Sequence, residues 1–301
     1  MSSRPVSVSV PSGELAEALS DDLDVVVWDL TGPPPRHRLD IVVLPYQQDP
    51  ARAHAVSAVD CALVQTQTIG YEDVLAHLPR GARIANAASV HEASTAELAL
   101  ALTLASLRRL PDYVRAAADG RWHQEPGETL AGRTVTVVGH GGVGRAITAR
   151  LAAFDAHVTA VARTARGDVR ALADLPQLLG RTEILVLAVP LMNETRHLVD
   201  DALLSALPDG ALVVNVSRGA VVDTDALLEH VRRGRLRAAL DVVDPEPLPR
   251  DHPLWQRPEV LITPHIGGAT ASMTARMAAL VTRQAAALAA GAEPENLVRG
   301  A

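Results

Sequence analysis

The sequence predicts an α/β protein in which a doubly wound parallel sheet follows a second α/β domain. Three observations support this fold class. A chain of 301 residues is long enough for about two domains. Short β-rich runs alternate with Ala- and Leu-rich helical stretches, as in βαβ units. A glycine pattern, G-x-G-x-x-G, stands between an apolar strand and a helix in the middle of the chain.

The first third of the chain fits one βαβ series. Because its apolar runs are short and bounded by polar or turn residues, we expect strands there and helices between several of them. The expected strands are 6–10, 25–28, 41–44, 62–65 and 83–86, and the expected helices are 13–19, 51–58 and 71–78.

A long Ala/Leu helix is expected next, over residues 94–110. Ser94 or Thr95 would introduce it, with Glu97 in its first turn, and Pro111 would close it. Residues 119–132, which include Gly120, Pro126 and Gly127, are expected to form a loop.

The second series contains six strands with helical crossovers, which is the pattern of a doubly wound sheet. A final helix over 272–290 would extend this domain or return to the first. The expected strands are 134–139, 157–163, 184–189, 212–217, 238–243 and 260–263, with helices over 142–154, 171–179, 200–207 and 224–233.

All 28 basic residues are arginine, and the absence of lysine excludes several enzyme classes. A pyridoxal-phosphate enzyme needs a lysine for its Schiff base, and a Walker-type NTPase needs the lysine of its P-loop. Arginine cannot replace lysine there, because it keeps its proton near neutral pH. Dehydrogenases that use a Tyr–Lys pair or a lone lysine as proton donor are excluded for the same reason.

The remaining composition gives expectations about location and partners. The net charge of −7 gives no reason to expect nucleic acid or an anionic membrane as a partner. Cys61 is the only cysteine, and its mostly apolar neighbours predict a buried thiol. Residues 1–10 do not resemble a signal peptide, and no apolar stretch reaches the ~20 residues of a membrane span. We expect a soluble cytoplasmic protein and predict no metal site.

The glycine motif consists of Gly139, Gly141 and Gly144. The first glycine permits a tight turn, the second lets the backbone approach a pyrophosphate, and the third lets helix and strand pack closely. Free N–H groups at the start of the helix then face the phosphates. The motif predicts a dinucleotide site.

The end of the next strand indicates which dinucleotide binds. An NAD enzyme usually places Asp or Glu about twenty residues after the motif. Here Arg163 and Thr164 stand at that point, with Arg166 close by and no carboxylate before Asp168. Because a guanidinium suits the 2′-phosphate, we predict a preference for NADP(H), with NAD(H) possible.

Four polar residues follow later strands, where ligands of doubly wound sheets bind. They are Arg218, Asp241, Glu246 and His265. Reduction of a ketone by hydride leaves an alkoxide, and histidine is a natural proton donor near neutral pH. Glu246 would orient His265, and Arg218 offers a planar fork for a carboxylate beside the ketone. A 2-keto acid presents both groups.

With these motifs the sequence resembles the D-isomer-specific 2-hydroxyacid dehydrogenase family over nearly its whole length. The most specific segments are 137–147, 190–198, 215–226, 239–247 and 264–270, in the family's order. The resemblance implies that Arg218, Glu246 and His265 are catalytic and that Asp241 contacts the nicotinamide carboxamide. It further implies that the cofactor is lined by Thr95, Gly142, Val143, Val189, Pro190, Thr195, Val216, Ser217 and Gly267.

The resemblance also assigns the domains. Residues 1–95 and 272–301 would form a flavodoxin-like substrate domain, and residues 96–271 the Rossmann domain. Ile69 and Gly70 match a loop whose N–H groups meet the substrate carboxylate, and Tyr46 lies in a second pocket loop. The family implies a homodimer and a pair of domains that closes around the substrate.

Within the family, Arg163 is similar to the NADP-preferring glyoxylate/hydroxypyruvate reductases, so glyoxylate or hydroxypyruvate is the expected substrate. Gly268 departs from that group, which often has serine there. Glu246 argues against formate dehydrogenase, and no regulatory domain of the phosphoglycerate dehydrogenase kind is expected after Ala301. Two alternatives stay open: a non-catalytic dinucleotide sensor like the corepressors of this fold, and a dehydrogenase of phosphite or a phosphorylated hydroxyacid.

Overall fold

The computed structural model describes residues 4–47 and 49–298. The chain forms two compact units: unit 1 comprises Met1–His91 and Thr270–Ala301, and unit 2 comprises Glu92–Ala269. Residues 1–3, part of the segment compared with a signal peptide, lie outside the described residues. So do residues 299–301 at the end of the expected substrate domain.

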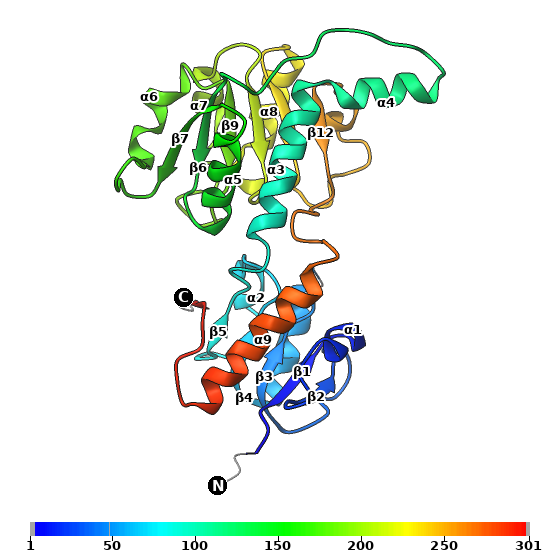
Figure 1. Ribbon diagram of the computed structural model, residues 1–301, viewed down its shortest axis with the longest axis vertical. Coiled ribbons are helices and arrows are strands. Elements are labelled where there is room, and N and C mark those ends of the chain that lie inside the picture. The colour runs from blue at the N-terminus through cyan, green and yellow to red at the C-terminus, as the bar shows by residue number, and fades with distance from the viewer. Residues whose placement is uncertain (1–3, 48, 299–301) are drawn as a thin grey trace. The chain divides into compact units, whose positions relative to one another are not determined.

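Unit 1 contains a six-stranded sheet in the order β13-β5-β4-β3-β1-β2 (Figure 1). The first five strands pair in parallel in the 2-1-3-4-5 order of flavodoxin-like folds, which confirms the fold predicted for this part. Only β13 is antiparallel to its neighbour. The strands are β1 (Ser7–Val10), β2 (Asp24–Val27), β3 (Arg38–Val43), β4 (Asp60–Gln65), β5 (Ile84–Ala85) and β13 (Leu297–Val298).

Helices cover both faces of this sheet. On one face Val8, Val10 and Ile41 pack with α1 and α9, and on the other Val42 and Val64 pack with a 3-10 helix and α2. Burial on both faces explains why the strands are runs of apolar residues. These helices are α1 (Gly13–Glu17), the 3-10 helix (Pro50–Ala58), α2 (Glu72–Leu75) and α9 (Met273–Ala289).

The last helix, α9, packs in unit 1. Met277 and Leu280 are fully buried in the cluster that contains Val8. Gln284 donates from Nε2 to Gln65 Oε1 at 2.8 Å, which ties the helix to the end of β4. In Figure 1 the red helix lies beside β1 and β3 of the same unit.

Unit 2 contains a seven-stranded sheet in the order β12-β11-β10-β9-β6-β7-β8. All its pairs are parallel, and counted from β6 the order contains the 3-2-1-4-5-6 arrangement of the Rossmann fold, as predicted. The strands are β6 (Thr134–Val138), β7 (His157–Ala162), β8 (Arg170–Ala171), β9 (Ile184–Leu187), β10 (Leu212–Asn215), β11 (Arg237–Leu240) and β12 (Val260–Ile262).

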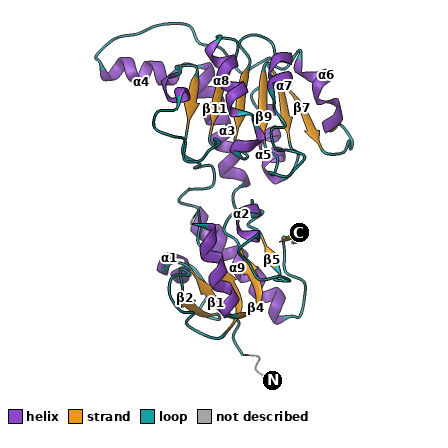
Figure 2. Ribbon diagram, turned by 180° about the vertical axis from the view of Figure 1, so that it is seen from behind, coloured by secondary structure: helices purple, strands orange, loops and turns teal. Residues whose placement is uncertain are grey.

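Helices flank this sheet too. Figure 2 shows purple helices beside the orange strands in each unit. One cluster packs α3 and α5 against the sheet, and a second packs α6, α7 and α8 against it. Among the residues described, no helix is long and apolar enough to span a membrane. The helices are α3 (Glu92–Leu107), α4 (Leu110–Ala118), α5 (Gly142–Ala152), α6 (Leu175–Leu179), α7 (Asp201–Ala206) and α8 (Thr224–Arg232), with 3-10 turns at Leu172–Asp174, Gly219–Val221 and Pro253–Gln256.

The predicted helix over 94–110 was wrong at both ends. The helix begins at Glu92, so Ser94 and Thr95 lie inside it, and it ends at Leu107. Arg109 adopts a left-handed φ of 55°, and Pro111 stands in the first turn of a separate helix, α4. Proline is tolerated in a first turn because the N–H it lacks has no partner there in any case.

Three further features also differ from the expectations. The strands β8 and β13 contain two residues each, too few for a recognisable pattern, and were not predicted. The helix expected over 51–58 is a 3-10 helix. Cys61 is half-buried rather than fully buried. Burial, together with Asp60, raises the pKa of its thiol, so the thiol stays protonated.

Candidate active site

The glycine motif forms a close turn between β6 and α5. Gly139 has a φ of 104°, and a Cβ there would collide with the carbonyl of Ala188. A Cβ on Gly144 would collide with the carbonyl of Gly139, whereas the space beside Gly141 is open. The helix starts without a side-chain cap. This glycine-lined helix N-terminus, where the Glu92 side chain lies against Gly142, is the candidate site for the pyrophosphate of a dinucleotide.

Two arginines bind the backbone of the same turn. Arg166 donates from Nη2 to the carbonyl of His140 at 3.1 Å, and Arg145 donates from Nη1 to the same oxygen at 3.4 Å. Burial, followed by these two guanidinium groups, lowers the pKa of His140, so its ring is neutral at neutral pH. Arg163 and Thr164 are exposed directly after β7, the strand beside β6. This edge of unit 2 suits an additional phosphate.

Asp241 holds the segment that carries His265. Its buried carboxylate accepts from the Thr263 hydroxyl at 2.7 Å and from the backbone N–H groups of Ile266 and Gly267 at 2.8 and 2.9 Å. Its backbone carbonyl accepts from the His265 N–H at 2.8 Å. His265 has a left-handed φ of 54°, a conformation that costs about 1–3 kcal/mol for a residue other than glycine. The Asp241 contacts therefore define where His265 points.

His265 and Glu246 form a hydrogen-bonded pair. His265 Nδ1 lies 2.6 Å from Glu246 Oε1, and both side chains are partly exposed, at 30% and 39%. Burial raises the pKa of Glu246, but the hydrogen bond and charge of His265, with the charge of Arg218, outweigh it, so this pKa is lowered overall. An ionised carboxylate can only accept, so Nδ1 carries the proton in this bond, and Nε2 is the ring nitrogen that the bond does not use.

Arg218 is presented by the loop after β10. Asn215 accepts the Ser217 N–H and hydroxyl at 3.0 and 2.7 Å and donates to the Arg218 carbonyl at 2.9 Å. Gly219 packs so closely on the carbonyl of Val243 that a Cβ would collide there. The loop of Arg218 is thus fixed against the segment that leads to Glu246, and the charge of Arg218 acts on that carboxylate.

The other predicted cofactor residues lie at several places in unit 2. Thr95 lies beside Gly267 and Asp241, since a Cβ on Gly267 would be 3.3 Å from the Thr95 Oγ1 and 3.0 Å from the Asp241 Oδ2. The Thr195 hydroxyl is engaged in its own loop, where it donates to Pro190 O at 2.6 Å and accepts from Met192 N–H at 2.8 Å. The rest follow strand ends or begin α5: Val143, Val189, Pro190, Val216 and Ser217.

The predicted substrate residues Tyr46, Ile69 and Gly70 all belong to unit 1 and are half-buried. Tyr46 follows β3, whereas Ile69 and Gly70 follow β4, its neighbour in the sheet. Both segments therefore come from the carboxyl edge of the same parallel sheet, where ligands of such sheets bind.

Sequence reasoning missed Asn215 and Thr263 as supports of the site. Both are polar residues at the end of an apolar strand, which was the available signal. Their partners, Arg218 and Asp241, show that they position other side chains.

We expect Asp241→Asn to lower the free energy of unfolding by about 1.5–3 kcal/mol and to reduce kcat, because an amide NH2 would face one of the N–H donors. Chemical denaturation and steady-state kinetics measure the two effects. Asp225→Asn, at an exposed position of α8, is the matched control. Equal stability of the Asp241 and Asp225 variants would contradict a stabilising role for the hydrogen bonds of the Asp241 carboxylate.

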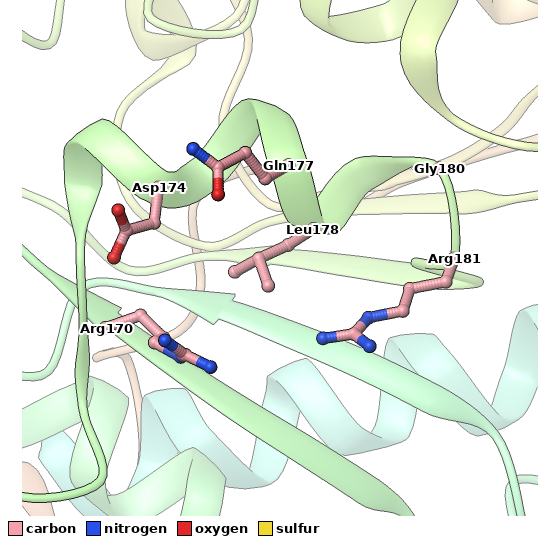
Figure 3. A pocket seen from close by; sticks show the side chains of 6 residues that line it. All are labelled: Arg170, Asp174, Gln177, Leu178, Gly180 and Arg181. Carbon is pink, nitrogen blue, oxygen red and sulfur yellow. The ribbon is translucent and has the colours of Figure 1, made fainter.

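A surface hollow of about 320 Å³ in unit 2 lies apart from these residues. Figure 3 shows the side chains of Arg170 and Arg181 on either side of Leu178. None of its lining residues is a predicted site residue, and its polar groups do not include a general acid paired with a carboxylate like His265 and Glu246. The site described above is therefore the stronger candidate.

Comparison with known proteins points the same way. The family model of the D-isomer specific 2-hydroxyacid dehydrogenase NAD binding domain matches residues 100–267. A glyoxylate reductase of Aeropyrum pernix is 32% identical over 311 residues, which cover 95% of this chain and 92% of that protein.

Two solved structures cover 99% of this chain and 99% of their own. One, from Xanthobacter autotrophicus, is a D-isomer specific 2-hydroxyacid dehydrogenase in complex with NADPH and MES, with 28% identity and a TM-score of 0.83. The other, from Sinorhizobium meliloti, is an NADPH-dependent glyoxylate/hydroxypyruvate reductase in complex with NADP and sulfate, with 25% identity and a TM-score of 0.83.

Proposed function

Because the chain belongs to the D-isomer-specific 2-hydroxyacid dehydrogenase family and is thus an NAD(P)-dependent oxidoreductase, we propose that it reduces a small 2-keto acid with NADPH. The observation that carries this proposal is the His265–Glu246 pair, which follows strand ends of the sheet that also carries the glycine turn. A proton donor beside a dinucleotide site is what reduction of a ketone requires.

The glycine turn at Gly139, Gly141 and Gly144 would hold the dinucleotide, and its dihydronicotinamide would supply the hydride. His265 then donates the Nε2 proton to the alkoxide oxygen of the product. Glu246 holds the imidazole through Nδ1 and so orients Nε2 for the transfer. Asp241, Thr263 and the left-handed turn at His265 keep the ring in place during the transfer.

Arg218 is proposed to bind the carboxylate of the substrate and to polarise the neighbouring ketone. Its guanidinium provides two parallel N–H donors, which match the two oxygens of a carboxylate. Ile69, Gly70 and Tyr46 of unit 1 are proposed to complete substrate recognition. Glyoxylate and hydroxypyruvate are the proposed substrates, a choice supported by the names of the relatives.

The preference for NADP(H) rests on Arg163, Thr164 and Arg166. We expect Arg163→Ala to lower kcat/KM for NADPH by about ten- to hundred-fold and to leave that for NADH within about twofold, because only NADPH carries the 2′-phosphate. Steady-state kinetics with both cofactors measure this. A wild-type enzyme that strongly prefers NADH would contradict the assignment.

A homodimer and a cytoplasmic location are also proposed. Val114 on α4 and Trp122 after it are 69% and 94% exposed, and apolar surface of this kind supports association with a second copy. Light scattering of the purified protein distinguishes a dimer from a monomer. No nucleic acid or membrane partner is proposed.

The substrate panel tests the proposal. NADPH oxidation is followed at 340 nm with glyoxylate, hydroxypyruvate, pyruvate and a phosphorylated 2-keto acid, and NADP reduction is followed with phosphite. Turnover of glyoxylate or hydroxypyruvate supports the proposed reductase. Tight NADPH binding without any turnover would favour a dinucleotide sensor. Turnover of phosphite or the phosphorylated acid alone would favour a dehydrogenase of phosphite or of a phosphorylated hydroxyacid.

A further inference from the structure

Unit 1 contains one buried histidine that the proposed mechanism does not use. His91 is only 4% exposed and is the last residue of unit 1 before α3 begins at Glu92. We propose that His91 is a positioning residue for the 2-keto acid, acting through residues 66–70 (the carboxylate loop). The inference rests on the proposed function and assigns a further residue to it.

His91 is bonded to the middle of the carboxylate loop. Its Nε2 lies 2.6 Å from the carbonyl oxygen of Gln67. Because a carbonyl can only accept, Nε2 carries the proton and donates it. Both residues are buried, so this bond fixes the orientation of the peptide group after Gln67 without competition from water.

The same histidine joins the carboxylate loop to the segment that carries Tyr46. The rings of His91 and Tyr46 lie with centroids 5.8 Å apart at 32°. The Gln67 amide donates from Nε2 to the carbonyl of Leu44 at 3.0 Å, two residues before Tyr46. His91 and Gln67 therefore hold both predicted substrate segments of unit 1 in one arrangement.

The carbonyl groups of the carboxylate loop are turned toward protein donors. Thr66 Oγ1 donates to Thr68 O at 2.7 Å, Thr68 Oγ1 donates to Gly70 O at 2.5 Å, and Asn86 Nδ2 donates to Ile69 O at 2.8 Å. Within the described part of the chain, the N–H groups of Ile69 and Gly70 have no hydrogen-bond partner. Donors arranged in this way suit an anionic carboxylate.

The turn that carries His91 is itself firmly held. Asn86 Oδ1 accepts from the Ala88 N–H at 3.1 Å, and Asn296 donates from Nδ2 to the Ala88 carbonyl at 2.9 Å. Arg276 of α9 donates to the carbonyl of Val90 at 3.1 Å. His91 is thus an anchored donor, and loss of its N–H would release the Gln67 peptide rather than shift the histidine.

The chemical step belongs to His265, so His91 should affect substrate binding more than turnover. We expect His91→Phe to raise KM for the best 2-keto acid about tenfold, with kcat and the Kd for NADPH within about twofold of wild type. Phenylalanine keeps an aromatic ring beside Tyr46 but lacks the donor. His91→Gln places an amide N–H near the position of Nε2 and should recover most of the loss.

The experiment compares wild type, H91F and H91Q in steady-state kinetics, NADPH binding and hydrogen exchange of the carboxylate loop. H54F, at an exposed histidine of unit 1, is the matched control. The expected result is a raised KM and faster loop exchange in H91F alone. An unchanged KM in H91F, or a loss that H91Q does not relieve, overturns the inference.

The proposed reductase function is contradicted by a different result, namely that the wild-type protein turns over no 2-keto acid. In that event the exchange rates decide the positioning role by themselves. Faster exchange of the loop in H91F, restored in H91Q, supports it, and equal exchange in wild type and H91F overturns it.

Discussion

His265→Ala is expected to lower kcat for 2-keto acid reduction by at least about 10²-fold, because the alkoxide then loses its general acid. The Kd for NADPH should stay within about twofold, since the phosphate groups of the cofactor are proposed to bind at the glycine turn and at the arginines around it. Stopped-flow kinetics and fluorescence titration measure the two quantities. Turnover near that of wild type would remove His265 from the mechanism.

Glu246→Gln separates the charge of the pair from its geometry. Glutamine keeps an oxygen that can accept from Nδ1 but removes the negative charge beside the ring, so kcat for reduction should fall in steady-state kinetics. The pKa of Glu246 is lowered in the folded chain, so its ionised carboxylate stabilises the fold at pH values above the ordinary glutamate pKa. This stabilisation is lost as the pH falls through the lowered pKa of the folded chain. The Tm difference between the two proteins should therefore shrink in acid.

Arg218→Lys is expected to lower kcat/KM for the 2-keto acid by about 10²–10³-fold. Lysine keeps the positive charge but presents a single point of donation, so it cannot bind a carboxylate through two parallel bonds and polarise the ketone as well. Steady-state kinetics measure the loss. Arg232→Lys, at an exposed position of α8, should have no effect.

A silent Arg218→Lys variant would show that guanidinium geometry is not used at this position. The surrounding loop makes such an outcome informative, because Asn215 and Gly219 hold the backbone in addition to the bond that Arg218 Nη1 donates to the Ser217 carbonyl at 2.8 Å. A loss of activity can therefore be assigned to the side chain once circular dichroism shows an unchanged fold.

The fold of unit 2 was predictable, and its candidate site residues could be named, because both have local signals in the sequence. The spacing of Gly139, Gly141 and Gly144 reports a backbone turn, and Arg218 and His265 stand where strands end. Pro111 misled the prediction because proline both follows helices and occupies their first turns. Only the packing of α3 and α4 distinguishes the two cases.

Residues that position the site were harder to predict because their partners are distant in sequence. The family resemblance implied a cofactor contact for Asp241 but not its hydrogen bonds to the N–H groups of Ile266 and Gly267, which lie more than twenty residues away in sequence. His91 reaches Gln67 across a similar separation. A sequence pattern reports the residue types at such positions but not the contact, which depends on how strand ends meet at one edge of a sheet.

Transfer of a labelled hydride tests the central proposal most directly. Hydroxypyruvate is reduced with NADPH that carries deuterium in both positions at C4 of the dihydronicotinamide, and the product is analysed by mass spectrometry and chiral chromatography. The proposed reductase yields D-glycerate with one deuterium at C2. Unlabelled glycerate, the L-isomer, or no product at NADPH concentrations that saturate the protein would contradict it.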